Sequence, residues 1–168
     1  MKRATLAVLL SIVAAACGSS TTAPTTASNP TFTAQLLPAN ETPPVTNAES
    51  VATGSATITF VTTKDASGAV TSAVGTAVVN VQGFPAGSSI TLAHIHTGAA
   101  GVAGAVLVPF VPSGTVALTN GSGTFTQTQN ISGTDATNIM NNPAGFYFNV
   151  HTALNPGGVM RGQLVRTQ

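Results

Sequence analysis

The feature that most constrains the fold of this chain is a series of short runs in which apolar and polar residues alternate. Alternation at every second position is typical of a β-strand with one buried face, and the Gly, Pro and Asn residues between the runs favour turns. Threonine and valine dominate the runs, as expected for β-branched residues on a pleated surface. The pattern predicts an all-β fold, an antiparallel β-sandwich. The predicted strands are Phe32–Leu37, Ser55–Val61, Val70–Val81, Ser89–His96, Ala105–Phe110, Gly123–Thr128, Phe146–His151 and Val159–Leu164.

One segment, near residues 134–142, has the pattern of a short helix instead. Thr134 is suited to cap its first turn, Asp135 favours that turn electrostatically, and Pro143 enforces a stop. We expect this helix to cover one end of the sandwich, with Ile139 and Met140 as its buried contacts.

The first residues have the layout of a signal peptide, with the cations Lys2 and Arg3 followed by an apolar stretch from Ala4 to Ala15. This stretch is shorter than the about 20 apolar residues of a membrane-spanning helix. The residues Val13-Ala14-Ala15-Ala16-Cys17-Gly18 resemble a bacterial lipobox, in which the cysteine is acylated and becomes the first mature residue.

The lipobox resemblance implies a signal peptide over residues 1–16 and a lipid anchor on Cys17, with ordinary cleavage near the same point as the alternative. Residues 17–30 are rich in Ser, Thr, Ala and Pro and are predicted to form a flexible linker. The protein is thus expected to be exported and membrane-anchored, in the outer membrane and periplasm or at the cell surface.

Charge and cysteine content restrict the partners and the means of stabilisation. Beyond the leader, the basic residues are Lys64, Arg161 and Arg166, which are scattered along the chain. Nucleic-acid binding needs clustered cations, so that class of partner is excluded. Cys17 is the only cysteine, so the domain predicted over residues 31–168 has no intramolecular disulfide and relies on packing.

The three histidines are the only cluster of potential ligand or catalytic side chains in the sequence, and all three lie in two predicted strands. His94 and His96 are two residues apart, so they project from one face about 6.6 Å from each other, together with Ile90 and Leu92. With His151 they would form a three-histidine copper or zinc site that leaves a position open for water. In the alternative reading, each histidine is a polar residue at a strand end that bonds a loop carbonyl.

No arrangement for hydrolysis is recognisable. The sequence lacks a Gly-x-Ser-x-Gly elbow, and its acidic residues show no paired arrangement. The glycine-rich segment Gly98–Gly104 leads into a strand rather than a helix, so it is interpreted as a turn and not as a phosphate loop. Arg161, the one cation inside a strand candidate, is predicted to form a buried ion pair with Glu41 or to lie near the histidines.

Three blocks of sequence carry a family resemblance. Leu36–Val45, Ala93–Gly98 and the stretch from Phe148 to Leu164 resemble the opening, central and closing motifs of a chordin-type (CHRD) domain. Together they span nearly all of residues 31–168. The resemblance implies an extracytoplasmic β-sandwich module; in animal chordin such modules belong to a secreted antagonist of growth factors. A shared fold does not by itself transfer a function.

The His-x-His strand, the later Val-His strand and Arg161 are also similar to the layout of copper-zinc superoxide dismutase. That enzyme uses more histidines than this chain has, so the similarity implies a mononuclear copper or zinc site at most. We therefore expect a Greek-key sandwich of the immunoglobulin-like or superoxide-dismutase-like kind.

Two functions follow from these features. The first is a lipid-anchored binding module without catalytic activity, which contacts a protein or a cell-envelope component. The alternative is a mononuclear copper- or zinc-binding protein, redox-active or not, with His94, His96 and His151 as ligands.

Overall fold

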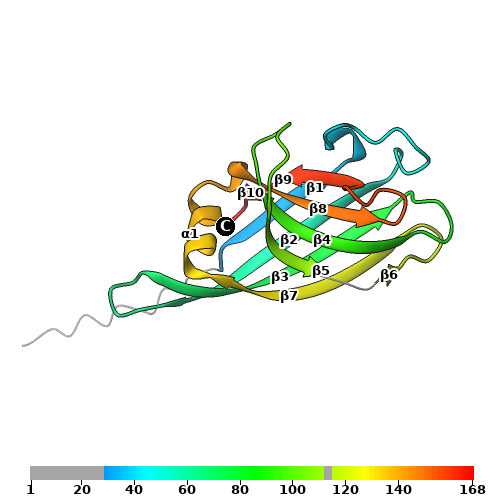
Figure 1. The fold of residues 1–168 in the computed structure, drawn as a ribbon. Helices are drawn as coiled ribbons and strands as arrows, with labels where there is room; N and C mark the ends of the chain where they lie inside the picture. The colour runs from blue at the N-terminus through cyan, green and yellow to red at the C-terminus, as the bar shows by residue number, and fades with distance from the viewer. Residues whose placement is uncertain (1–28, 112–114) are drawn as a thin grey trace, which may run out of the picture.

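The computed structural model describes residues 29–111 and 115–168 (Figure 1). The predicted signal peptide, Cys17 and nearly all of the predicted linker lie outside these residues. Within the described part of the chain, no helix has the length and apolar character needed to span a membrane.

Strands account for most of the described residues, and all of their pairings are antiparallel. The strands are β1 (Thr31–Leu36), β2 (Thr53–Lys64), β3 (Val70–Gln82), β4 (Ser89–Thr97), β5 (Val106–Val111), β6 (Val116–Ala117), β7 (Gly123–Ser132), β8 (Phe146–Thr152), β9 (Met160–Gln163) and β10 (Val165–Arg166). One α-helix, α1 (Gly133–Asn141), and two 3-10 turns, η1 (Pro38–Asn40) and η2 (Pro143–Gly145), complete the set.

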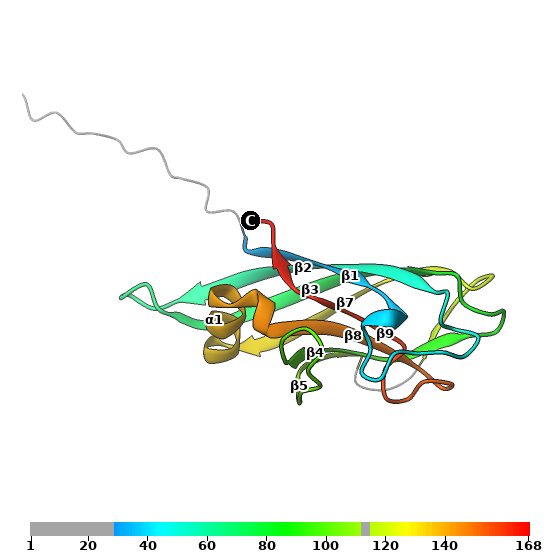
Figure 2. The same ribbon diagram turned by 90° about the horizontal axis from the view of Figure 1, so that it is seen from above.

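The strands form two sheets packed face to face, as Figure 2 shows from above. The first sheet has the order β10-β1-β2-β3-β7, and the second has the order β5-β4-β8-β9 with β6 also paired to β4. Large apolar side chains from both sheets fill the space between them, among them Phe32, Ile58, Phe60, Ile95, Phe110 and Phe148. The predicted all-β sandwich is thereby confirmed.

The last predicted strand, Val159–Leu164, corresponds to β9, and the chain then crosses to the other sheet as β10. β9 pairs with β8 in the second sheet, whereas β10 pairs with β1 in the first, and buried Leu164 lies at the crossing. Here the sheets approach very closely, because a Cβ atom on Gly162 would lie 2.0 Å from the Gln35 carbonyl oxygen. Only glycine allows this approach. The neighbouring residue, Arg161, therefore lies beside the end of β1.

Helix α1 lies at one end of the sandwich, and the segment that follows η1 lies at the other (Figure 2). The cap is Ser132 rather than the predicted Thr134, because the Ser132 hydroxyl accepts a hydrogen bond from the Asp135 backbone N–H at 3.0 Å. Ile139 is fully buried as predicted, whereas Met140 is only partly buried.

A β-bulge in β4 changes which residues share a face. Ile90 pairs with Thr152 and Leu92 with His151, so two residues of β4 advance against one of β8. The extra residue reverses the alternation, and the core residues become Ile90, Ala93 and Ile95. The expectation that Ile90 shares a face with His94 and His96 is therefore wrong, since the histidines project away from the core.

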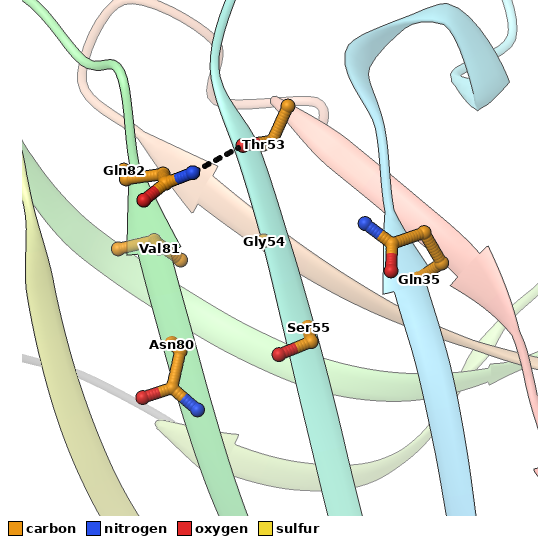
Figure 3. A pocket seen from close by; sticks show the side chains of 7 residues that line it. All are labelled: Gln35, Thr53, Gly54, Ser55, Asn80, Val81 and Gln82. Atoms are coloured by element: carbon orange, nitrogen blue, oxygen red, sulfur yellow. Dashed lines mark hydrogen bonds between the residues drawn. The ribbon is translucent and has the colours of Figure 1, made fainter.

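The outer face of the first sheet carries uncharged polar side chains. A shallow hollow of about 240 Å³ at one end is lined by Gln35, Thr53, Gly54, Ser55, Asn80, Val81 and Gln82, and the Gln82 amide donates to the Thr53 hydroxyl at 3.3 Å (Figure 3).

The second sheet differs, because every residue of its strand β8 is buried, whether its side chain lies on the inner or the outer face. Its outer face is therefore covered by loops.

Candidate metal centre

A buried polar layer lies on the outer face of the second sheet. Strand β4 contributes His94 and His96, and the neighbouring strands contribute Tyr147, Asn149, His151 and Arg161. Each of these side chains has 8% or less of its surface exposed. Polar groups buried to this extent need partners, so each partner, or its absence, bears on function.

The pairing of β4 with β8 brings the three predicted histidines together. The ring of His94 lies 5.0 Å from that of His151 and 5.4 Å from that of His96, measured between centroids. One nitrogen from each ring lies within 4.8 Å of the other two. Ligand nitrogens around a tetrahedral zinc ion are about 3.4 Å apart, so a small inward movement of the rings would accommodate an ion.

Loop carbonyls fix the tautomers of two of the histidines. His96 Nδ1 lies 3.0 Å from the Gly104 carbonyl oxygen, and His151 Nδ1 lies 2.9 Å from the Pro156 carbonyl oxygen. A carbonyl oxygen only accepts, so both Nδ1 atoms carry the proton and both Nε2 atoms keep a lone pair. This is the arrangement that commonly orients histidine ligands of metals.

One nitrogen of each histidine remains available to bind an ion. His94 Nδ1, His96 Nε2 and His151 Nε2 are buried and have no hydrogen-bond partner among the residues that the structure describes. The alternative reading, in which every histidine bonds a loop carbonyl, therefore accounts for one nitrogen of His96 and one of His151. It leaves three buried nitrogens unsatisfied.

Burial keeps the imidazoles neutral. The pKa of His94 is lowered from 6.5 to about 4, first by desolvation and then by the neighbouring His151 and His96. Desolvation is also the main reason for the lowered pKa values of His96 and His151, and it outweighs the loop carbonyls, which raise them. Neutral imidazole is the form that binds a metal.

An aromatic stack holds the plane of His96. The Tyr147 ring lies parallel to the His96 ring, at 4.9 Å between centroids and an interplanar angle of 8°. The guanidinium of Arg161 covers the same tyrosine ring, with Cζ 4.6 Å from its centroid. The Tyr147 hydroxyl accepts from the Gly104 backbone N–H at 3.3 Å, which ties the stack to the loop over His96.

Arg161 ties the covering loops together. Its Nε donates to the Asn40 carbonyl at 2.6 Å, one terminal nitrogen donates to the Val102 carbonyl at 3.1 Å, and the other donates to the Thr42 hydroxyl. The predicted partner Glu41 is at a longer distance, 3.9 Å from Nε to Oε2. A cavity of about 500 Å³ adjoins Arg161 and Glu41, and none of the histidines lines it.

Glu41 interacts with the polar layer through Asn149, whose amide Nδ2 donates to Glu41 Oε1 at 2.9 Å. Burial raises the pKa of Glu41 from 4.5 to about 7, against the opposing effects of Arg161 and Asn149. The role of Asn149 was missed at the sequence level. The signal available was the alternation of Tyr147, Asn149 and His151 along one strand, which places all three on one face.

Glu49 holds the loop that bonds His151. This buried carboxylate accepts from the Thr152 hydroxyl and the Asn155 amide, both at 2.6 Å, and Asn155 also bonds Asn47. The loop from 153 to 158, which supplies the Pro156 carbonyl, is thereby attached to the segment before β2. No sequence motif marks Glu49.

The family model of the CHRD domain matches residues 32–164. The three sequence blocks that resemble CHRD motifs all lie within the matched residues, and so do the three histidines. No curated protein and no solved structure matches the chain.

Proposed function

This chain belongs to the CHRD domain family, and from that premise we propose that it is an exported binding module whose ligand is a single copper or zinc ion held by His94, His96 and His151. The observation that carries the proposal is the set of three buried imidazole nitrogens without partners. It favours the metal over the protein or envelope ligand that the sequence placed first.

Unsatisfied buried nitrogens make the binding of an ion energetically favourable. A buried polar nitrogen without a partner costs about 1–3 kcal/mol, and each of the three histidines has one such nitrogen. The three residues are close enough for one ring nitrogen of each to lie within 4.8 Å of the other two. An ion at their centre satisfies all three at once. The rings of His96 and His151 are already oriented by loop carbonyls, so little reorganisation opposes binding.

The ligand set favours divalent copper over divalent zinc. Imidazole nitrogen suits both ions, and the affinity of nitrogen sites generally rises to its maximum at Cu²⁺. Three neutral ligands leave the positive charge of the ion uncompensated. Because 8% or less of each histidine is exposed, the centre suits ion binding and exchange of water or a small anion rather than reaction of a large substrate.

The test is elemental analysis of the purified chain after loading with copper or zinc and removal of excess metal. We expect about one ion per chain, and none in the variant with His94→Ala, His96→Ala and His151→Ala. A control with Thr57→Ala, Thr126→Ala and Thr128→Ala changes three exposed residues of the opposite sheet and should retain the ion. Metal content that does not depend on the histidines would contradict the proposal.

The same proposal places the domain outside the cytoplasm on a lipid anchor at Cys17. Its support is the resemblance of residues 13–18 to a lipobox and the signal-peptide layout before it.

A further inference from the structure

A fourth buried acceptor lies in the polar layer beside the three histidine nitrogens. The side-chain oxygen of Asn149, Oδ1, has no hydrogen-bond partner in the described residues, and the residue is 2% exposed. The four unsatisfied side-chain atoms of this part of the chain are therefore His94 Nδ1, His96 Nε2, His151 Nε2 and this oxygen.

The register places Asn149 next to the ligand nitrogens. Asn149 is directly opposite His94 in the pairing of β4 with β8, and it lies between Tyr147 and His151 on its own strand. Residues opposite each other on one face of a sheet have Cβ atoms about 4.5–5.5 Å apart. His94 binds through Nδ1, the ring nitrogen nearer its Cβ, so an ion would lie close to this pair.

The orientation of the amide is fixed from the other side. Asn149 is opposite Arg161 in the pairing of β8 with β9, and its Nδ2 donates to Glu41 Oε1 at 2.9 Å. In this hydrogen bond the nitrogen of the amide, and not its oxygen, faces Glu41. Since the two amide atoms diverge, Oδ1 is directed away from Glu41.

The chemistry of the four atoms indicates which group would satisfy them. Asn149 Oδ1 is an acceptor, and so are His96 Nε2 and His151 Nε2, because the protons lie on their carbonyl-bonded Nδ1 atoms. His94 Nδ1 is an acceptor when its proton lies on Nε2, and none of the four atoms has a partner within the described residues. An ion satisfies the three nitrogens, and a water bound to that ion is a strong donor for the oxygen. We infer that Asn149 is a positioning residue of the metal centre, whose Oδ1 accepts a hydrogen bond from the water that completes the coordination of the ion.

This inference rests on the proposed function and adds a preference to it. The added preference is for a divalent ion that is coordinated by three imidazoles and keeps one water as its fourth ligand. Because Asn149 is neutral, it holds the water without cancelling the charge of the ion, and a small anion can replace that water.

The test compares metal affinity in variants of the purified chain, measured for Cu²⁺ and Zn²⁺ by competition with a chelator. Asn149→Leu removes the acceptor in a side chain of similar size, and we expect affinity to fall by about 10- to 100-fold. Asn149→Asp keeps an oxygen acceptor but removes the donor to Glu41, so it is combined with Glu41→Gln, whose amide can donate to the aspartate. This double variant should bind at least as tightly as the wild type. If Asn149→Leu does not fold, Asn149→Ala makes the same comparison.

A matched control is Gln163→Leu, which removes three side-chain hydrogen bonds to carbonyls from the neighbouring strand β9. Its affinity should be unchanged. The visible spectrum of the Cu²⁺-loaded protein should shift in Asn149→Leu and not in Gln163→Leu, because only the first change alters the bound water.

The outcomes separate this inference from the proposed function. If the wild type binds one ion through its histidines but Asn149→Leu keeps its affinity and spectrum, the role of Asn149 is refuted and the metal site stands. If the wild type binds no ion through its histidines, the proposed function itself fails.

Discussion

At the scale of single residues, burial decides the charge of Glu41. Its pKa is raised to about 7 because desolvation outweighs the attraction of Arg161 at 3.9 Å and the hydrogen bond from Asn149. Glu41 therefore attracts Arg161 less strongly than the fully charged carboxylate of the predicted ion pair would. The arginine is held by two carbonyls and a hydroxyl instead.

A pH-dependent stability follows from this pKa. The folded protein holds the Glu41 proton more tightly than the unfolded chain does, so the contribution of Glu41 is complete below about pH 4.5 and is lost as pH rises to 7. The loss amounts to about 3 kcal/mol. In Glu41→Gln this slope should be absent, so the variant gains stability relative to the wild type between pH 4.5 and 8.

Denaturant unfolding of both proteins across this pH range, with a chelator present, measures the difference. The histidines titrate equally in the two proteins, so their effect cancels in the comparison. Two curves that stay parallel from pH 4.5 to 8 would show that folding does not change the pKa of Glu41.

The residues themselves indicate how far sequence reasoning can reach. The spacing of His94 and His96 predicts a shared face, which the structure shows. The convergence of His151 could not be predicted, because it depends on the pairing of strands that are distant in sequence. The roles of Asn149 and Glu49 depend on contacts over more than 100 residues, and no local pattern reports such contacts.

At the scale of elements, the strands place the histidines together and the loops hold their rings. The loop from 98 to 105 brings the Gly104 carbonyl to His96, and this glycine is tightly enclosed, since an added Cβ would lie 1.7 Å from the Thr97 carbonyl oxygen. The loop from 153 to 158 contains Gly157, around which an added Cβ meets no atom within 4 Å.

These two glycines make a matched pair. Gly104→Ala should displace the loop, release His96 Nδ1 from its carbonyl and weaken metal binding by about 10-fold or more. Gly157→Ala should bind as the wild type does, although it lies in the other loop over the site. Chelator competition measures both variants, and equal affinities for the two would argue against a role for the Gly104 carbonyl.

Some elements of the fold leave no signal in the sequence. The bulge in β4 reverses the alternation after Ile90, and simple periodicity carries no sign of it. Strands β6 and β10 contain two residues each, too few to show a period. The long strands β2, β3 and β7 were predicted in place but shorter than they are, because mostly polar residues extend them beyond the alternating runs. Examples are Thr62 and Thr63 in β2, Gln82 in β3, and Gln129 and Asn130 in β7.

At the scale of the whole molecule, the architecture was the most predictable property. Alternating Thr and Val residues with few charges leave little other than a two-layer β-structure, and the family motifs are spread along the entire domain. What the pattern could not indicate is the second, polar layer outside the second sheet. Loops from three parts of the chain bury it, and burial by loops leaves no periodic signal.

The proposed anchor is tested on the complete chain. Expressed in a bacterial host with labelled palmitate, the wild type should incorporate the label and Cys17→Ser should not, because no other thiol is present. Label in neither protein would contradict lipidation, and label in both would place the lipid on another residue.

The central claim is that one ion is bound by three histidines on the outer face of the second sheet. Anomalous diffraction from crystals of the copper- or zinc-loaded protein, recorded at the absorption edge of the metal, tests it most directly. We predict one peak about 2.0–2.1 Å from His94 Nδ1, His96 Nε2 and His151 Nε2. A loaded crystal with no peak among these nitrogens, or with its peak at other residues, would contradict the claim.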